Sequence, residues 1–130
     1  MPRDNSKEMK QDAFGVEKVG VFNPEDYQTY SQESPMIVGV YRDGIDIRHV
    51  TLRNFEPGQE SALHIHPENA HCIYVLEGEG LVLTGEGSDL PIKAGQFLIV
   101  PRDTLHGLRN TGKGRLSYLG VNAGAEPEKH

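Results

Sequence analysis

The chain has 130 residues and a mass of 14.4 kDa, which suits one domain with one core. Its net charge of -6 and the lack of clustered Lys and Arg exclude a nucleic-acid surface. No apolar run approaches the roughly 20 residues of a membrane helix, and no apolar segment follows the charged N-terminus. We therefore expect a cytoplasmic protein without a membrane partner, and the single Cys72 agrees with a reducing compartment.

The two ends of the chain differ in composition from its middle. Residues 1–18 are polar and charged, so we expect a flexible arm that carries no chemistry. Residues 126–130 form a polar tail, and residues 19–125 are expected to form a single β-barrel domain. The order Asn-Pro-Glu-Asp at 23–26 has a capping residue and a proline at the first helical position, which predicts one short helical turn.

From Met36 onward, short apolar or alternating segments are separated by turn residues such as Asp-Gly and Pro-Gly. Strands at this spacing, without a convincing long helix, predict an all-β antiparallel sandwich or small barrel. The expected strands are 36–41, 45–53, 61–66, 72–76, 81–84, 90–93, 96–100, 104–110 and 115–121.

Three histidines lie within one short stretch of the expected barrel. His64 and His66 are two residues apart, so on a strand both side chains leave the same face. The stretch from Pro67 to Ala70 can turn the chain so that His71 returns opposite them, as in a hairpin. Three imidazoles this close together indicate a metal ion.

The spacing around these histidines resembles the first motif of the cupins, from Gly58 through the His64-x-His66 pair to His71 and Gly78, with His71 where the family usually has Glu. The second cupin motif is matched from Gly95 through Pro101 and His106 to Asn110, with Asp103 where a glycine is usual. Two motifs in the right order are more specific than either alone.

This resemblance implies a double-stranded β-helix, or jelly-roll barrel, in which His64, His66, His71 and His106 bind one divalent transition metal ion. Imidazole nitrogen suits Zn, Fe, Mn or Ni. Four neutral imidazoles would leave the ion its full charge, which favours a small anionic ligand. His71 has an alternative role, in which it supports a ligand from behind rather than binding the ion itself.

Two classes of function follow. The first is a small-molecule metalloenzyme, either dioxygenase-like or a lyase, isomerase or cyclase; the second is a non-catalytic metal- or ligand-binding cupin, such as a sensor or accessory protein. A metal-free barrel that binds a sugar or small acid is a third possibility. The sequence identifies no catalytic acid or base. Apolar residues on both faces of the 72–76 strand predict a homodimer.

Other residues have plainer interpretations. We expect His49 to be an ordinary surface or core residue and Cys72 to face away from His71 and pack in a core. Gly58, Gly78 and Gly95 are expected in turns, and Asn110 is expected to satisfy backbone groups in a loop. Most of the larger apolar side chains should belong to the core, namely Leu83, Phe97, Ile99, Leu108 and Tyr118.

Overall fold

The computed structural model describes residues 19–42, 44 and 46–124, which form one short 3-10 helix and nine strands. The predicted N-terminal arm and C-terminal tail lie outside the described residues, so the domain boundaries stay predictions. No helix in the described part of the chain is long and apolar enough to cross a membrane. The elements are η1 (Pro24–Tyr27), β1 (Met36–Arg42), β2 (Ile47–Phe55), β3 (Glu60–His64), β4 (Ala70–Glu77), β5 (Glu79–Leu83), β6 (Leu90–Lys93), β7 (Phe97–Val100), β8 (His106–Asn110) and β9 (Leu116–Ala123).

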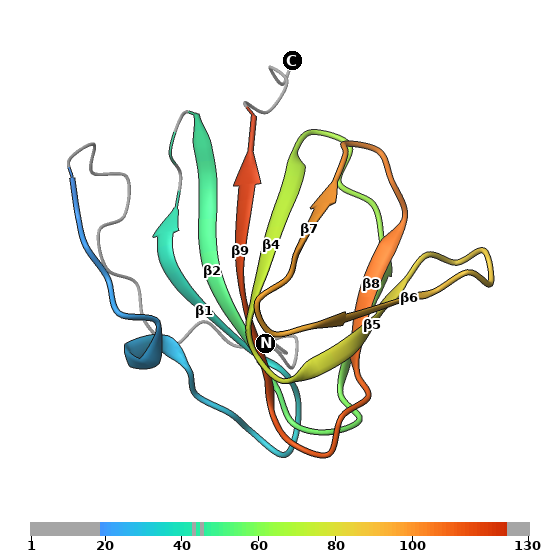
Figure 1. The fold of residues 1–130 in the computed structure, drawn as a ribbon. Helices are drawn as coiled ribbons and strands as arrows, with labels where there is room; N and C mark the ends of the chain where they lie inside the picture. Colours follow the sequence, from blue (N-terminus) through green and yellow to red (C-terminus); the bar gives the residue numbers. More distant parts are fainter. Residues whose placement is uncertain (1–18, 43, 45, 125–130) are drawn as a thin grey trace.

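The strands form two antiparallel sheets that face each other, as the sequence predicts (Figure 1). The larger sheet has the order β1-β2-β9-β4-β7 and the smaller one the order β3-β8-β5-β6. Every turn glycine that the motifs single out has a positive φ: 85° at Gly58, 88° at Gly78 and 89° at Gly95. Asp103 also has a positive φ, of 65°, at the place where the second motif usually has glycine.

The inner face of the larger sheet is organised in rows across β2, β9 and β4. Phe55 lies beside Leu116 at the closed end of the barrel, and the neighbouring row is Arg53, Tyr118 and Val75. Leu108, Val82 and Ile92 of the smaller sheet pack against these apolar side chains and complete the main core. Burial of this cluster supplies the hydrophobic contribution to folding.

The next two rows toward the open end are different. In the first of them, Thr51 lies between Gly39 and Gly120, so the part of this row on β1, β2 and β9 carries little side-chain bulk. On β4 the same row continues with Ile73, which belongs to the main core. The outermost row is His49, Asn122 and His71, all from different strands. The barrel is therefore apolar at one end and polar at the other.

The outer face of the larger sheet has its own apolar cluster. Tyr27, from η1, packs with Val38, Val40 and Leu52, and the Asn54 amide donates a hydrogen bond of 3.0 Å to the Tyr27 carbonyl. The predicted helical turn is thus confirmed, and it anchors the segment before β1 on this face.

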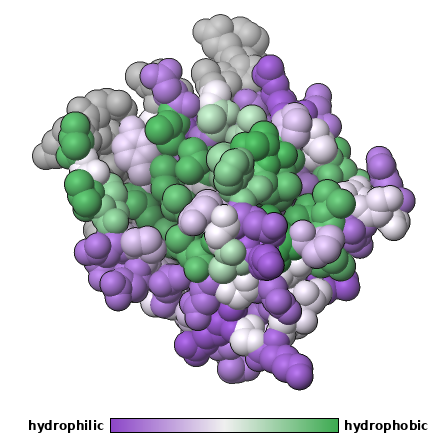
Figure 2. All heavy atoms as spheres, in the orientation of Figure 1, coloured by the Kyte–Doolittle hydropathy of each residue, from purple (hydrophilic) through white to green (hydrophobic). Residues whose placement is uncertain are grey.

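The outer face of β4 and β7 is not covered in this way. Phe97 and Ile99 are 67% and 57% exposed, and Tyr74 is 42% exposed beside them. Cys72 is also exposed and faces away from His71. The prediction that Cys72, Phe97 and Ile99 lie in a core is wrong, because they project outward from the last two strands of the sheet; Leu83, Leu108 and Tyr118 are buried as predicted. Figure 2 shows apolar surface gathered over this part of the molecule.

The hairpin predicted for the three clustered histidines is also wrong. β3 pairs with β8 in the smaller sheet, whereas β4 pairs with β7 and β9 in the larger one. β3 also ends at His64, so His66 lies in the connection. Pro67 limits how far β3 could continue, because proline has no N–H for a strand ladder. The chain crosses between sheets here, and His71 faces the other histidines across the barrel.

Candidate metal site

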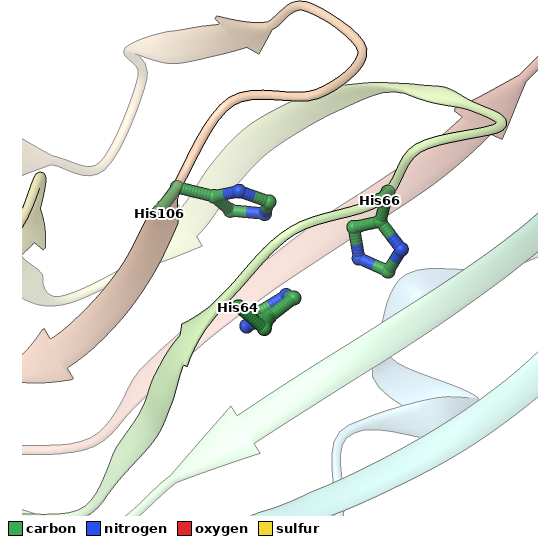
Figure 3. Close-up of side chains that lie close together, drawn as sticks. All are labelled: His64, His66 and His106. Carbon is green, nitrogen blue, oxygen red and sulfur yellow. The ribbon is translucent and has the colours of Figure 1, made fainter.

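Three histidines converge at the open end of the barrel. His64 comes from the last residue of β3, His66 from the connection that follows, and His106 from the first residue of β8 (Figure 3). His64 and His106 are partners in the β3–β8 ladder, and their ring centroids are 4.4 Å apart. The possible ligand nitrogens of the three residues all lie within 4.8 Å of one another.

Backbone carbonyl groups fix which nitrogen of two rings is free. His64 Nδ1 lies 2.6 Å from the Ala62 carbonyl oxygen and His106 Nδ1 lies 2.9 Å from the Thr104 carbonyl oxygen. A carbonyl oxygen only accepts, so each Nδ1 carries the proton and each Nε2 keeps a lone pair. In metal sites, a hydrogen bond of this kind from one ring nitrogen orients the histidine so that its other nitrogen, here Nε2, can bind the ion.

His66 supplies a third free nitrogen. Its Nε2 atom is buried and has no hydrogen-bond partner among the described residues. A buried polar atom without a partner is costly in a folded protein unless something binds it. Its backbone is fixed as well, since the Asp103 N–H donates a hydrogen bond of 3.0 Å to the His66 carbonyl. The three imidazoles thus fit a transition metal ion that prefers nitrogen ligands.

His71 approaches the same cluster from the larger sheet. Its Nε2 is 2.8 Å from the Asn122 side-chain oxygen, which accepts the proton, so its Nδ1 keeps the lone pair. That Nδ1 lies 3.4 Å from His106 Nε2, and its ring centroid is 4.6 Å from that of His66. Two nitrogens that share one ion at about 2.0–2.1 Å each are roughly 3.0–3.4 Å apart. His71 is nonetheless not one of the three residues whose ligand nitrogens group together.

Burial keeps these rings neutral. It lowers the pKa of His66 to about 4 and that of His71 to about 3, and it also lowers the pKa of His106. Neighbouring histidines and the positive charge of Arg53 lower all three values further. Neutral imidazole is the form that binds a metal ion, so the site is prepared for one near neutral pH.

An open cavity of about 600 Å³ lies beside the cluster. His64, His66 and Arg53 line it together with Phe55 and Ser61. The carboxylates on its lining are those of Glu33, which is exposed, and Glu60, which pairs with Arg109 at 2.7 Å. A small molecule therefore has a path to the side of the histidine cluster.

Several residues near the site were not predicted. His49 is half-buried on the inner face of β2, and its charge contributes to the lowered pKa of His66. Arg53 and Asn122 also face the barrel interior, because their strands alternate between the two faces. The sequence held one signal for Arg53: it is two positions before the apolar Phe55, so on a strand the two side chains leave the same face. Asn110 acts as expected, donating to the Phe55 and Gly114 carbonyls.

Comparison with known proteins agrees with this architecture. A family model described as "Cupin domain" matches residues 51–122, which is more than half of the chain and includes every histidine of the cluster. The chain is a cupin. Its barrel is similar to a solved structure from Klebsiella pneumoniae, an uncharacterized conserved protein with a double-stranded β-helix domain. The TM-score is 0.76 at 28% identity, covering 86% of this chain and all of that one.

Other similar proteins share part of this cupin. An oxalate-binding protein of Thermotoga maritima is 38% identical over 65 residues, covering 50% of this chain and 53% of the relative. A germin-like protein of Arabidopsis thaliana is 34% identical over 82 residues, covering 58% of this chain and 37% of the relative. A solved structure from Thermotoga maritima, titled as a predicted oxalate decarboxylase, has a TM-score of 0.58 at 32% identity over 61% of this chain and 68% of that one. The matches span about half or less of the curated relatives' length.

Proposed function

We propose that this cupin binds one divalent transition metal ion through His64, His66 and His106, with His71 as a fourth ligand through its Nδ1 atom, and that a small anionic molecule binds at the ion. The observation that carries the proposal is the set of free imidazole nitrogens beside an open cavity. The ion would act as a Lewis acid and would attract an anion because the proposed ligand set has no carboxylate.

The name of the Thermotoga relative supports a small carboxylate as the anion. That protein is called oxalate-binding, and it is similar to this chain over 65 residues. Carboxylates suit a site that combines a metal ion with neutral imidazoles and a nearby guanidinium, because they can contact both kinds of positive centre.

The first experiment is elemental analysis of untagged protein purified without chelators. We expect about one Zn, Fe, Mn or Ni ion per chain. His64→Ala should remove it, whereas His130→Ala, which changes a histidine outside the motifs, should retain it. Calorimetry should then detect malonate binding to metal-loaded protein and none to chelator-treated protein. A stoichiometry near zero in the wild-type protein, or equal malonate binding with and without the ion, would contradict the proposal.

Catalysis is the second candidate, because the cavity gives a substrate access to the cluster. A site that serves only to stiffen the barrel would need no such access. Oxygen-electrode measurements with the Fe-loaded protein test dioxygenase-like turnover, and product analysis under nitrogen tests lyase or isomerase activity. Turnover that His106→Ala abolishes would favour an enzyme over a sensor or accessory protein.

We also propose that the cupin forms a homodimer through the exposed face of β4 and β7. This face presents Tyr74, Phe97 and Ile99 next to each other, and β7 is the last strand of its sheet. Apolar surface on an edge of this kind is costly in water. Light scattering should give twice 14.4 kDa for the wild type and a monomer for Phe97→Glu. Leu63→Glu, a matched change at another exposed apolar residue, should remain a dimer.

A further inference from the structure

Arg53 is a half-buried cation inside the barrel, and no carboxylate of the described residues forms an ion pair with it. The ion pairs found among the described residues are Arg109 with Glu60 and Arg115 with Glu56. Neither pair includes Arg53. Its Nε donates a long hydrogen bond of 3.5 Å to Thr51 Oγ1. A guanidinium removed from water without an acidic partner is costly, so a partner from outside the chain would relieve it.

The side chain of Arg53 runs toward the histidines. Thr51, which its Nε contacts, belongs to the row one step nearer the open end of the barrel. In that row Thr51 lies between Gly39 and Gly120, which have no side chains to obstruct the long side chain of Arg53. Arg53 and the cluster residues His64 and His66 line the same cavity, so one small molecule can touch both.

The charge of Arg53 already reaches the cluster. It lowers the pKa of His66, His71 and His106, and it contacts the hydroxyl of Tyr118, whose pKa burial raises. The buried Tyr118 hydroxyl therefore stays protonated, so it contacts the Arg53 guanidinium without neutralising its charge. A bound metal ion would add a second positive centre to this end of the barrel.

We propose that Arg53 is a specificity-determining residue that selects small dicarboxylates, with one carboxylate at the ion and the other paired with the guanidinium. The proposal rests on the proposed function, since it needs an anion at the metal. The planar guanidinium can donate two parallel hydrogen bonds to a carboxylate, which a single-acid ligand of the same length cannot use. The site would then discriminate between ligands by their second acidic group.

The test is calorimetry of metal-loaded protein with malonate and succinate as dicarboxylates and propionate as the monocarboxylate. The wild type should bind the better dicarboxylate roughly 10- to 100-fold more tightly than propionate, as expected for an added charge-assisted hydrogen-bonded pair. Arg53→Gln should remove most of this difference while leaving propionate binding within about threefold. Arg53→Lys keeps the charge but not the fork, so it should be intermediate.

A matched control separates this effect from a change in net charge. Arg115→Gln removes the same charge at the surface, away from the cavity, and should bind all three acids as the wild type does. Chelator competition gives a second readout: Arg53→Gln should bind the metal as tightly as the wild type or more tightly, because a nearby cation is gone.

The outcomes distinguish the two proposals. If the metal-loaded wild type binds none of the acids, the anion site itself fails and Arg53 has no ligand to select. If the wild type binds a dicarboxylate and Arg53→Gln and Arg53→Lys bind it equally well, only the role of Arg53 is overturned. A parallel loss of metal from Arg53→Gln would also overturn that role, since Arg53 would then serve the histidines alone.

Discussion

The two ends of the barrel interior are built by the same strands and have opposite chemistry. On β8, His106 lies at the open end and Leu108 in the core, and on β4 His71 is two residues before Ile73. Both histidines are as well buried as their apolar neighbours, at 5% exposure each. Burial alone therefore does not separate a ligand from a core residue. What separates them is the set of neighbours, because His71 shares its row with His49 and Asn122, whereas Leu108 and Ile73 pack among apolar side chains.

The largest effect expected at the open end is the loss of metal from His106→Ala. This change removes an Nε2 lone pair that faces both His64 and His71. We expect the metal affinity to fall by at least about 100-fold, while the free energy of unfolding of the chelator-treated protein changes by no more than about 1 kcal/mol. Competition with a fluorescent chelator measures the first quantity and urea denaturation the second. Retention of the metal would exclude His106 as a ligand.

Two residues further along β8 the expectation is reversed. Leu108 is 2% exposed and packs in the main core, so Leu108→Ala should destabilise the protein by about 2–5 kcal/mol. In the fraction that remains folded, the metal stoichiometry should be unchanged. Urea denaturation and elemental analysis of the same samples test both points. If Leu108→Ala loses the metal while remaining folded, metal binding depends on core packing and the two ends of the barrel are not independent.

Much of this contrast was predictable from local sequence. The resemblance to the two cupin motifs implied that His64, His66 and His106 lie together, and the structure groups these three residues. Asp103, in the glycine place of the second motif, takes the left-handed conformation that the motif requires. The pattern of short strands and turns likewise predicts the all-β barrel, since it depends on neighbours in the chain.

The rest depends on pairing between distant strands. Arg53 and Asn122 reach the interior near the histidines only because β2, β9 and β4 are adjacent in one sheet, which no local pattern reveals. The separation of β3 from β4 has the same cause. Cys72, Phe97 and Ile99 are exposed because β7 ends its sheet and the segment around Tyr27 covers a different part of the face.

Asn122 offers a sharper test of the open end, because its side-chain oxygen contacts His71 directly. Its side-chain oxygen holds His71 Nε2 at 2.8 Å and so directs Nδ1 toward His106. If His71 binds the ion, Asn122→Ala should weaken metal affinity by roughly 10-fold. Asn122→Asp, which keeps an acceptor, should not weaken it. The measurement is chelator competition on both variants. Equal affinity in Asn122→Ala and wild type would assign His71 to a supporting role.

The smallest effect concerns pH, which should act on the open end and leave the core unaffected. In the metal-free protein the pKa values of His66 and His71 are about 4 and about 3, lowered chiefly by burial from the ordinary 6.5. As the pH falls below 6.5, His66 and His71 become protonated in the unfolded chain but stay neutral in the folded chain. Stability should therefore be constant above about pH 7 and should decline steadily from 6.5 toward 4, where the folded rings at last become protonated.

Urea midpoints of chelator-treated protein at several pH values between 7.5 and 5 measure this decline. The range stops at 5 so that it stays above the ordinary pKa values of carboxylic acids, which are about 4. A variant with both His66→Asn and His71→Asn should show a flatter dependence of the urea midpoint on pH, since the two imidazoles with lowered pKa values are gone. Leu108→Ala, less stable throughout, should keep the wild-type slope. A wild-type midpoint that rises as the pH is lowered would mean that these two rings are stabilised by protonation, and the polar end of the barrel would then not favour neutral imidazole.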